Sequence, residues 1–163
     1  MLKNTFNYKE WSDKRLLTAL SDIPAARSQE VIHFAQQQLN HMVIVEEIFR
    51  AHLQSLPSPH QSTNTLKFPS LQELAARLAR SNRWFQEFIS DISDEHLQKT
   101  VLFDFTDGQS GCMSTIEILF HIINHGTYHR SAIAHQIQHA GYIRPADTFS
   151  MYIHQVEPNR RAR

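Results

Sequence analysis

The sequence predicts an all-α protein, a four-helix bundle with long crossover connections. Three observations carry this prediction: glycines are few, the six prolines fall between regularly patterned segments, and four segments repeat apolar residues at helical spacing. Helices that each carry one apolar stripe can bury those stripes only against one another. The length of 163 residues is that of an ordinary domain, so we expect a single domain over residues 1–163.

The first two helices are expected before residue 57. Apolar residues at helical spacing predict a helix from about residue 5 to the stop at Pro24. A second segment of the same kind predicts a helix from near Ser28 to just before Pro57. The stretch between Pro57 and Pro69 is rich in Ser, Pro, Asn and Gln, and we expect it to form a loop.

Two capping boxes mark the starts of the remaining helices. Ser70 precedes Glu73 by three positions, and Ser114 precedes Glu117 in the same way. In each pair the hydroxyl and the carboxylate can satisfy amide groups that lack partners at a helix start. The third helix is expected to continue to about residue 91, and the fourth to end before Gly141.

The segment between the third and fourth helices carries the pattern of a short β-hairpin. Residues 100–105 are rich in β-branched and aromatic side chains. Asp107-Gly108, which follows them, suits a tight turn with positive φ. We therefore expect a short β-hairpin between these two helices.

Composition and charge exclude several classes of function. Sixteen Lys and Arg residues balance sixteen Asp and Glu residues, which argues against nucleic acid or an anionic membrane surface as a partner. The sequence has neither an apolar stretch of membrane-spanning length nor a signal peptide, so we expect a cytoplasmic protein. Cys112 is the only cysteine, and we expect it to be a small buried residue rather than a nucleophile. The tail, residues 155–163, is expected to fray.

Eleven histidines are the feature that needs explaining. In the fourth predicted helix, His121, His125 and His129 follow one another at intervals of four, so their rings form a row on one face. Two imidazoles at this spacing can reach a single metal ion, although such a pair taken alone more often lies on a solvated face. His125 and His129 bracket the middle of their helix, and His41 lies near the middle of the second helix. These three histidines are therefore expected to hold one divalent transition metal.

Three imidazoles leave a coordination position open, which is typical of a catalytic rather than a structural ion. Gly126 follows His125 where the zinc-protease motif has Glu, so that class is excluded. A di-iron carboxylate site is excluded as well, because only Glu30 and His33 show the required Glu-x-x-His spacing. His121 keeps two interpretations at this stage: a pocket wall or hydrogen-bonding neighbour of the ligands, or an ordinary surface or core residue.

The sequence resembles the DinB-like family of bacterial four-helix-bundle proteins, and three motifs carry the resemblance over essentially the whole chain. They are Asn124-His125-Gly126-Thr127-Tyr128-His129-Arg130, the upstream Leu39-Asn40-His41, and Tyr8-x-x-Trp11 near the start. The resemblance implies His41, His125 and His129 as metal ligands, a Zn, Ni or Fe-class ion, and a homodimer. In some members it implies transfer of a low-molecular-weight thiol, such as bacillithiol or mycothiol, to an electrophile. The chain departs from the family pattern at Ser131, where Gly is typical, and at Asp13, where Asn is frequent.

The leading hypothesis is a metal-dependent thiol S-transferase that activates a small-molecule thiol at an open three-histidine site. Coordination to a dication deprotonates a thiol, which supplies a nucleophile without a protein base. His121, Asn124 and Tyr128 are candidates for the pocket, and no residue beyond the ligands is assigned to catalysis. Two alternatives stay open. One is a metal-dependent hydrolase, and the other is a non-enzymatic stress-response protein that binds a metal or a small ligand.

Overall fold

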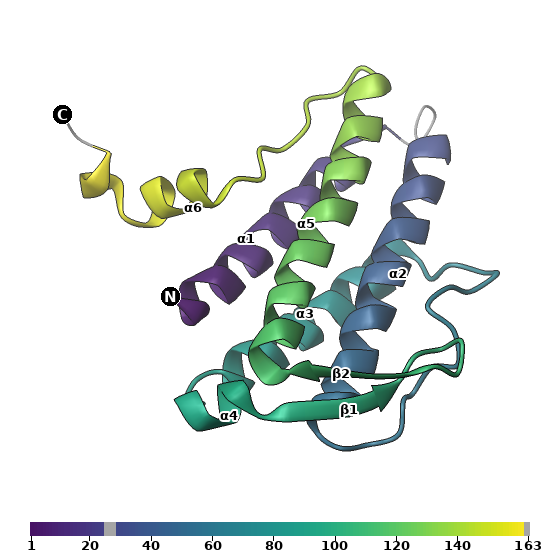
Figure 1. The fold of residues 1–163 in the computed structure, drawn as a ribbon. Helices are drawn as coiled ribbons and strands as arrows, with labels where there is room; N and C mark the ends of the chain where they lie inside the picture. Colours follow the sequence, from purple (N-terminus) through teal and green to yellow (C-terminus); the bar gives the residue numbers. More distant parts are fainter. Residues whose placement is uncertain (25–28, 162–163) are drawn as a thin grey trace.

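The computed structural model describes residues 1–24 and 29–161, and four long helices dominate it (Figure 1). The helices of the bundle are α1 (Leu2–Ser21), α2 (Gln29–Leu53), α3 (Leu71–Phe88) and α5 (Thr115–His139). Between α3 and α5 lie the short helix α4 (Asp94–Gln98) and the strands β1 (Thr100–Asp104) and β2 (Ser110–Ser114), and after α5 come α6 (Phe149–Val156) and the 3-10 helix η2 (Pro158–Arg160). The predicted all-α bundle with a short hairpin is confirmed.

Local signals set the ends of the long helices. Both capping boxes form, and the carboxylates of Glu73 and Glu117 accept hydrogen bonds from the backbone amides of Ser70 and Ser114 at 2.8 and 2.7 Å. At its other end α5 stops at Gly141, whose φ of +86° favours a residue without a side chain. The predicted bounds hold to within about three residues. The expected start of the second helix near Ser28 lies outside the described residues.

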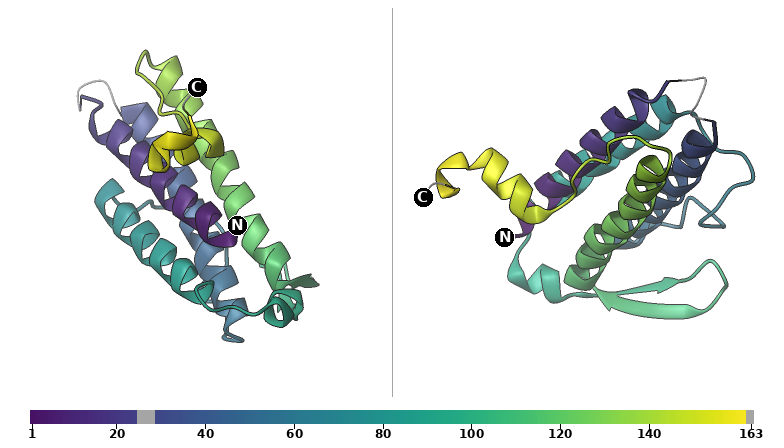
Figure 2. Two further views of the ribbon diagram at one scale, coloured as in Figure 1. Left: turned by 90° about the vertical axis from the view of Figure 1, so that its left-hand side faces the viewer. Right: turned by 90° about the horizontal axis from the view of Figure 1, so that it is seen from above.

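The helices α2 and α3 run parallel to each other and antiparallel to α1 and α5. The amide of Gln36, early in α2, donates to the carbonyl of Pro69 just before α3, which places the starts of these two helices together. Phe6 near the start of α1 stacks on Phe85 near the end of α3, with ring centroids 5.4 Å apart. The connection between α2 and α3, residues 54–70, must therefore cross the length of the bundle. Figure 2 shows the four helices from the side and from above.

A layer of polar residues divides the core of the bundle into two apolar parts. One apolar cluster includes Leu16, Leu20, Val31, Ala35, Leu39, Leu74, Leu78, Ile133 and Ile137. The other includes Phe6, Val45, Phe49, Phe85, Phe103, Ile118, Leu119 and Ile122. On α1, α3 and α5 the buried polar residues stand between members of the two clusters, and Glu46 of α2 joins them through Lys9. These residues include Lys9, Asp13, Glu46, Ser81, Asn82 and Arg130. The middle of the bundle is therefore polar on all four helices.

The hairpin lies across the ends of α2 and α5 (Figure 1). Its strands are antiparallel, with Phe103 opposite Gly111 and Leu102 opposite Cys112, and Gly108 in the turn has the predicted positive φ, +85°. Phe103 is buried toward the bundle, whereas Leu102 and Cys112 are exposed on the opposite face. The expectation of a buried Cys112 is therefore wrong, because alternate residues of a strand face opposite sides.

The helix α6 was not expected from the sequence. It packs on α1 through Tyr152 and Phe149, whose rings contact Tyr8 and Trp11. The tail that we expect to fray overlaps the end of α6 and continues as η2, so its described part has regular structure. None of the helices in the described part of the chain is long and apolar enough to span a membrane.

Candidate metal centre

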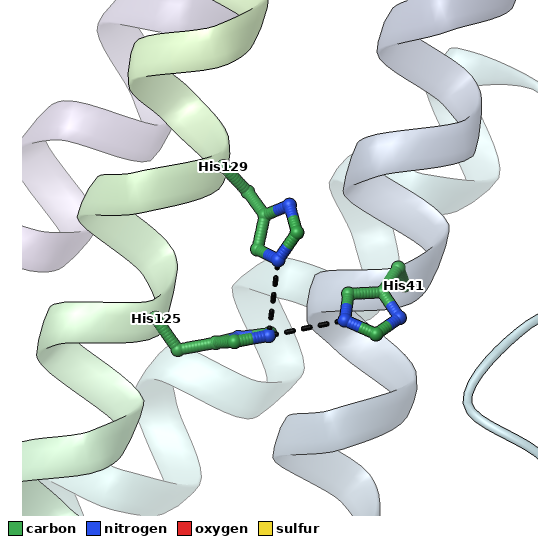
Figure 3. A group of neighbouring side chains, drawn as sticks. All are labelled: His41, His125 and His129. Carbon is green, nitrogen blue, oxygen red and sulfur yellow. Dashed lines mark hydrogen bonds between the residues drawn. The ribbon is translucent and has the colours of Figure 1, made fainter.

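Three histidine side chains meet in the middle of the bundle. His41 extends from α2, and His125 and His129 extend from successive turns of α5 (Figure 3). The Nε2 atom of His125 lies 3.1 Å from Nε2 of His41 and 3.1 Å from Nε2 of His129. Each side chain is partly buried, and the three can offer their ring nitrogens to a single ion. The structure thus brings together the three histidines that the sequence singles out.

Hydrogen bonds to the other ring nitrogens orient two of these imidazoles. Nδ1 of His41 donates to the backbone carbonyl of Thr63 at 3.0 Å, and Nδ1 of His129 donates to Oε1 of Gln38 at 2.6 Å. A carbonyl oxygen can only accept, so it fixes the proton on Nδ1 and leaves the Nε2 lone pair facing the centre. This is the tautomer that a metal-binding histidine needs.

The spacing of the Nε2 atoms matches the demands of a first-row metal. Nitrogens held about 2.0–2.1 Å from a tetrahedral ion lie about 3.3–3.4 Å from one another. The two separations of 3.1 Å are close to that value. Unprotonated nitrogens at such distances repel one another unless a cation or a shared proton lies between them. The residues present therefore fit a divalent ion with three protein ligands and a further position open.

The loop that supplies the carbonyl of Thr63 is fastened to α2 and α3 by polar contacts. Asn40 Nδ2 donates to Thr65 Oγ1 at 2.8 Å, and His60 Nε2 contacts Glu47 Oε2 at 2.6 Å. Arg77 Nη2 from α3 forms an ion pair with the same Glu47 oxygen at 2.6 Å. This loop therefore does more than connect two helices, because its anchored backbone sets the orientation of His41.

The electrostatics of the centre favour neutral imidazoles. Burial, followed by the neighbouring His129, lowers the pKa of His125 to about 3. Burial, followed by the neighbouring His41, lowers the pKa of His129 to about 4. Both rings are consequently uncharged at neutral pH, and their lone pairs need not lose a proton before they bind a cation.

These two pKa values predict that the metal-free protein loses stability as the pH falls below about 6.5. In the unfolded chain both histidines titrate near their ordinary pKa of about 6.5. Between that pH and about 4, the unfolded state binds more protons than the folded state at these positions, so the free energy of unfolding falls with pH. Urea unfolding at pH 7.5, 6.0 and 5.0 measures the effect.

The control is the same series on a variant that carries His125→Gln and His129→Gln, with His139→Gln as a neutral companion. The double variant is expected to lose less stability than the parent over this interval, while His139→Gln behaves as the parent does. Equal pH dependence in all three proteins would contradict the assignment of the shifts to the centre.

The three residues expected around the ligands take different places. His121 stacks on His125 with ring centroids 5.1 Å apart and also contacts Phe49, so it forms a wall beside the ligands. Tyr128 is exposed and presents its ring at right angles to His129 at 5.2 Å. Asn124 is exposed and lines an apolar groove that Phe120 and His121 share. His121 and Tyr128 thus adjoin the centre, and Asn124 does not.

A buried network of charges beside the centre was missed in the sequence. Lys9 Nζ lies 2.9 Å from Asp13 and 2.8 Å from Glu46, and Arg130 Nη1 lies 3.1 Å from Asp13. Arg130 Nε also lies 2.8 Å from Asp147, which ties the segment after α5 to the bundle. A signal was present, because Lys9 and Asp13 interrupt the apolar face of α1 at positions one helical turn apart.

The charges of neighbouring side chains shift the pKa values of this network. Burial alone would raise the pKa of Asp13, but the charges of Lys9 and Arg130 hold it below its ordinary value. Burial would lower the pKa of Lys9, but Asp13 and Glu46 hold it above its ordinary value. Burial raises the pKa of Glu46. The layer therefore places two buried cations, Lys9 and Arg130, against the buried carboxyl groups of Asp13 and Glu46.

The network also explains the glycine that follows His125. A Cβ atom at Gly126 would lie 2.9 Å from Nη1 of Arg130 and 3.7 Å from Cε of Lys9. The absence of a side chain therefore leaves room for the guanidinium of Arg130, while Lys9 lies at ordinary van der Waals distance. The two departures from the family pattern are likewise accommodated: Ser131 is exposed, and Asp13 carries the charge that pairs with Lys9 and Arg130.

Comparison with known proteins gives one family and one relative. The model of the DinB family matches residues 1–161. Among curated proteins, the chain is similar to "Protein DinB" of Bacillus subtilis (strain 168), with 24% identity over 160 residues that cover 91% of this chain and 91% of that protein. No solved structure matches the chain.

Proposed function

Because the chain belongs to the DinB family, we propose that it is a metal-dependent enzyme that transfers a low-molecular-weight thiol to an electrophile. The observation that carries this proposal is the convergence of three Nε2 atoms, from His41, His125 and His129, with a coordination position left over. Imidazole ligands suit Zn, Ni and Fe ions, so an ion of this class is the proposed cofactor.

The charge of the bound ion determines the chemistry that the site could perform. A divalent ion bound here would favour the thiolate form of a thiol at neutral pH, without a protein base. Thr63 and Gln38 hold two of the ligand rings in place, and His121 closes one side. In the reaction the sulfur forms a bond to the electrophilic carbon, the bond from that carbon to its leaving group breaks, and the leaving group departs with the electron pair. The thiol proton passes to solvent.

A reducing compartment fits the proposed thiol chemistry. Cys112, the only cysteine, is exposed, and an exposed unpaired thiol is typical of proteins in a reducing compartment. Low-molecular-weight thiols are also kept reduced there. We therefore propose the cytoplasm as the place where the protein acts.

Conjugation of a thiol to an electrophile tests the proposed function directly. The metal-loaded protein is expected to accelerate conjugation of cysteine, bacillithiol or mycothiol to an activated aryl halide, and His125→Ala is expected to reduce the rate to that of the uncatalysed reaction. His139→Ala, at the far end of α5, serves as the control and should keep the full rate. A loaded protein that hydrolyses an activated ester but conjugates none of these thiols would identify a hydrolase instead.

We further propose that the protein is a homodimer, with α5 at the interface. Phe120 and Tyr128, two turns apart on α5, have exposed fractions of 68% and 71%. Phe120 also lines an apolar groove that Leu2 and Met113 share. Large apolar side chains gathered on one face are typical of a surface that another chain covers.

Sedimentation equilibrium at micromolar concentration is expected to give the mass of a dimer for the parent and of a monomer for Phe120→Asp, because a carboxylate cannot be buried unpaired in an apolar interface. Ile143→Asp changes an even more exposed apolar residue outside this face and should leave the dimer intact. A monomeric parent protein would overturn the proposal.

A further inference from the structure

A cavity of about 250 Å³ lies between the metal centre and the hairpin. His41 and His125 form part of its wall, so it opens onto two of the three ligand rings from the side of His121. Its other walls come from the lower turns of α2 and from β1 with the turn that follows. Any molecule that reaches the centre from this side must occupy the cavity.

Most of the wall area of the cavity is apolar, although four histidines and two threonines also line it. Val45, Ile48 and Phe49 from α2 face Phe103 and Phe105 from the hairpin. None of the described residues that line it is a lysine or an arginine, and Asp104, its one carboxylate, is exposed to solvent. A negatively charged group would meet no cation here other than the ion itself. An uncharged hydrocarbon group would exchange water for carbon contacts on several sides.

We propose that this cavity binds an uncharged apolar group of the substrate, a single ring or a short alkyl chain, next to the atom that reacts. The inference rests on the proposed function and specifies its substrate class. The volume supports this size, because a cavity of about 150 Å³ already holds benzene, whereas pockets for drug-sized ligands begin near about 300 Å³. The charged parts of a larger substrate must then lie outside, beyond the hairpin.

The hairpin positions the outer wall of this cavity. The ring of Phe103 packs edge to face on Phe49 at 5.5 Å and on Phe105 at 5.1 Å. Phe105 is half exposed and stands at the mouth. A Cβ atom at Gly111 would lie 2.6 Å from Cε2 of Phe105, so this ring keeps its place only because position 111 has no side chain. Gly111 is thus a positioning residue for the aromatic wall.

The affinity of the cavity for alkyl groups is tested with straight-chain thiols, from ethanethiol to butanethiol. Titration calorimetry measures their binding to the Zn²⁺-loaded Cys112→Ala protein. Each buried methylene is expected to tighten binding about fourfold, the factor that corresponds to about 0.8 kcal/mol. The anionic 3-mercaptopropionate is expected to bind more weakly than propanethiol. Thiols that bind with equal affinity at every chain length would overturn the inference while leaving the proposed function intact.

A second probe, toluene, carries no group that binds metal and therefore separates the cavity from the proposed function. Binding of toluene to the metal-free Cys112→Ala protein, followed by NMR shifts of residues in α2 and β1, is the expected result. If no thiol binds the loaded protein and toluene still binds, the thiol function fails and the cavity assignment stands. If toluene does not bind, the cavity assignment fails.

Two variants test whether the hairpin contributes to thiol binding. Gly111→Ala displaces the ring of Phe105 and is expected to weaken butanethiol binding about tenfold, and Phe105→Ala about fivefold, with metal binding unchanged in both. Cys112→Ala, the neighbour on the outer face of the same strand, is the matched control and defines the parent affinity. Parent affinity for butanethiol in both hairpin variants would overturn the role of the hairpin.

Discussion

Replacing His125 by Ala is expected to abolish stoichiometric metal binding. The Nε2 atom of His125 lies 3.1 Å from Nε2 of His41 and from Nε2 of His129, so His125 is the central residue of the group. Loss of this imidazole leaves two ligands on different helices with no enforced geometry, and affinity falls steeply when a chelating set is reduced to two. Titration calorimetry with Zn²⁺ and with Ni²⁺ measures the change.

The companion variants make the result specific to the centre. His41→Ala and His129→Ala are expected to lose binding nearly as completely, and His139→Ala not at all. His121→Ala is expected to keep the metal, because its ring stacks on His125 instead of adding a nitrogen to the cluster. Added metal should raise the melting temperature of the parent, since a ligand that binds only the folded state stabilises it. Binding by His41→Ala at full affinity would show that the third ligand comes from elsewhere.

Replacing Lys9 by Met is expected to lower the free energy of unfolding by about 3–5 kcal/mol, the range for removing one partner of a buried ion pair. Lys9 is fully buried and contacts both Asp13 and Glu46 at hydrogen-bond distance. Without it, Asp13 keeps Arg130 and Asn82 as partners, but Glu46 loses its only cation among the described residues. Urea unfolding of the metal-free protein at pH 7 gives the magnitude.

Two further variants test whether the unpaired charge is the cause. Adding Glu46→Gln to Lys9→Met removes the carboxylate that has lost its partner, and the double variant is expected to be more stable than Lys9→Met alone. Lys14→Met in the same helix breaks an exposed ion pair with Glu10 and should cost no more than about 1 kcal/mol. Equal losses for Lys9→Met and Lys14→Met would contradict the assigned role of the buried network.

The parts of the fold that the sequence predicts are those encoded within a few residues. Capping boxes at Ser70 and Ser114, and the turn at Gly108, act locally and appear as expected. The grouping of the three histidines was predictable for a different reason. A helix has a fixed rise per residue, so the depth of His41 in α2 and of His125 in α5 follows from their positions once both helices are known to span the bundle.

Features that depend on contacts between distant segments were not predictable in this way. The face on which Cys112 lies is decided by the pairing of the two strands, and a shift of one residue would reverse it. Lys9 interrupts the apolar face of α1, but its pairing with Glu46 becomes apparent only when α1 and α2 are packed together. The helix α6 needs the aromatic surface of Tyr8 and Trp11, which lie more than a hundred residues earlier in the chain.

The polar layer in the middle of the bundle has a consequence for how many structures this sequence can adopt. Apolar stripes of similar width allow one helix to slide along its neighbour by a turn, about 5.4 Å, and still bury hydrocarbon. The ion pairs Lys9–Glu46 and Asp13–Arg130 join α1 to α2 and to α5, so such a slide would separate these charges and move them toward one of the two apolar clusters. Alternative alignments of the helices are thereby penalised. The three imidazoles, which come from helices that could otherwise shift past each other, stay level in a single arrangement.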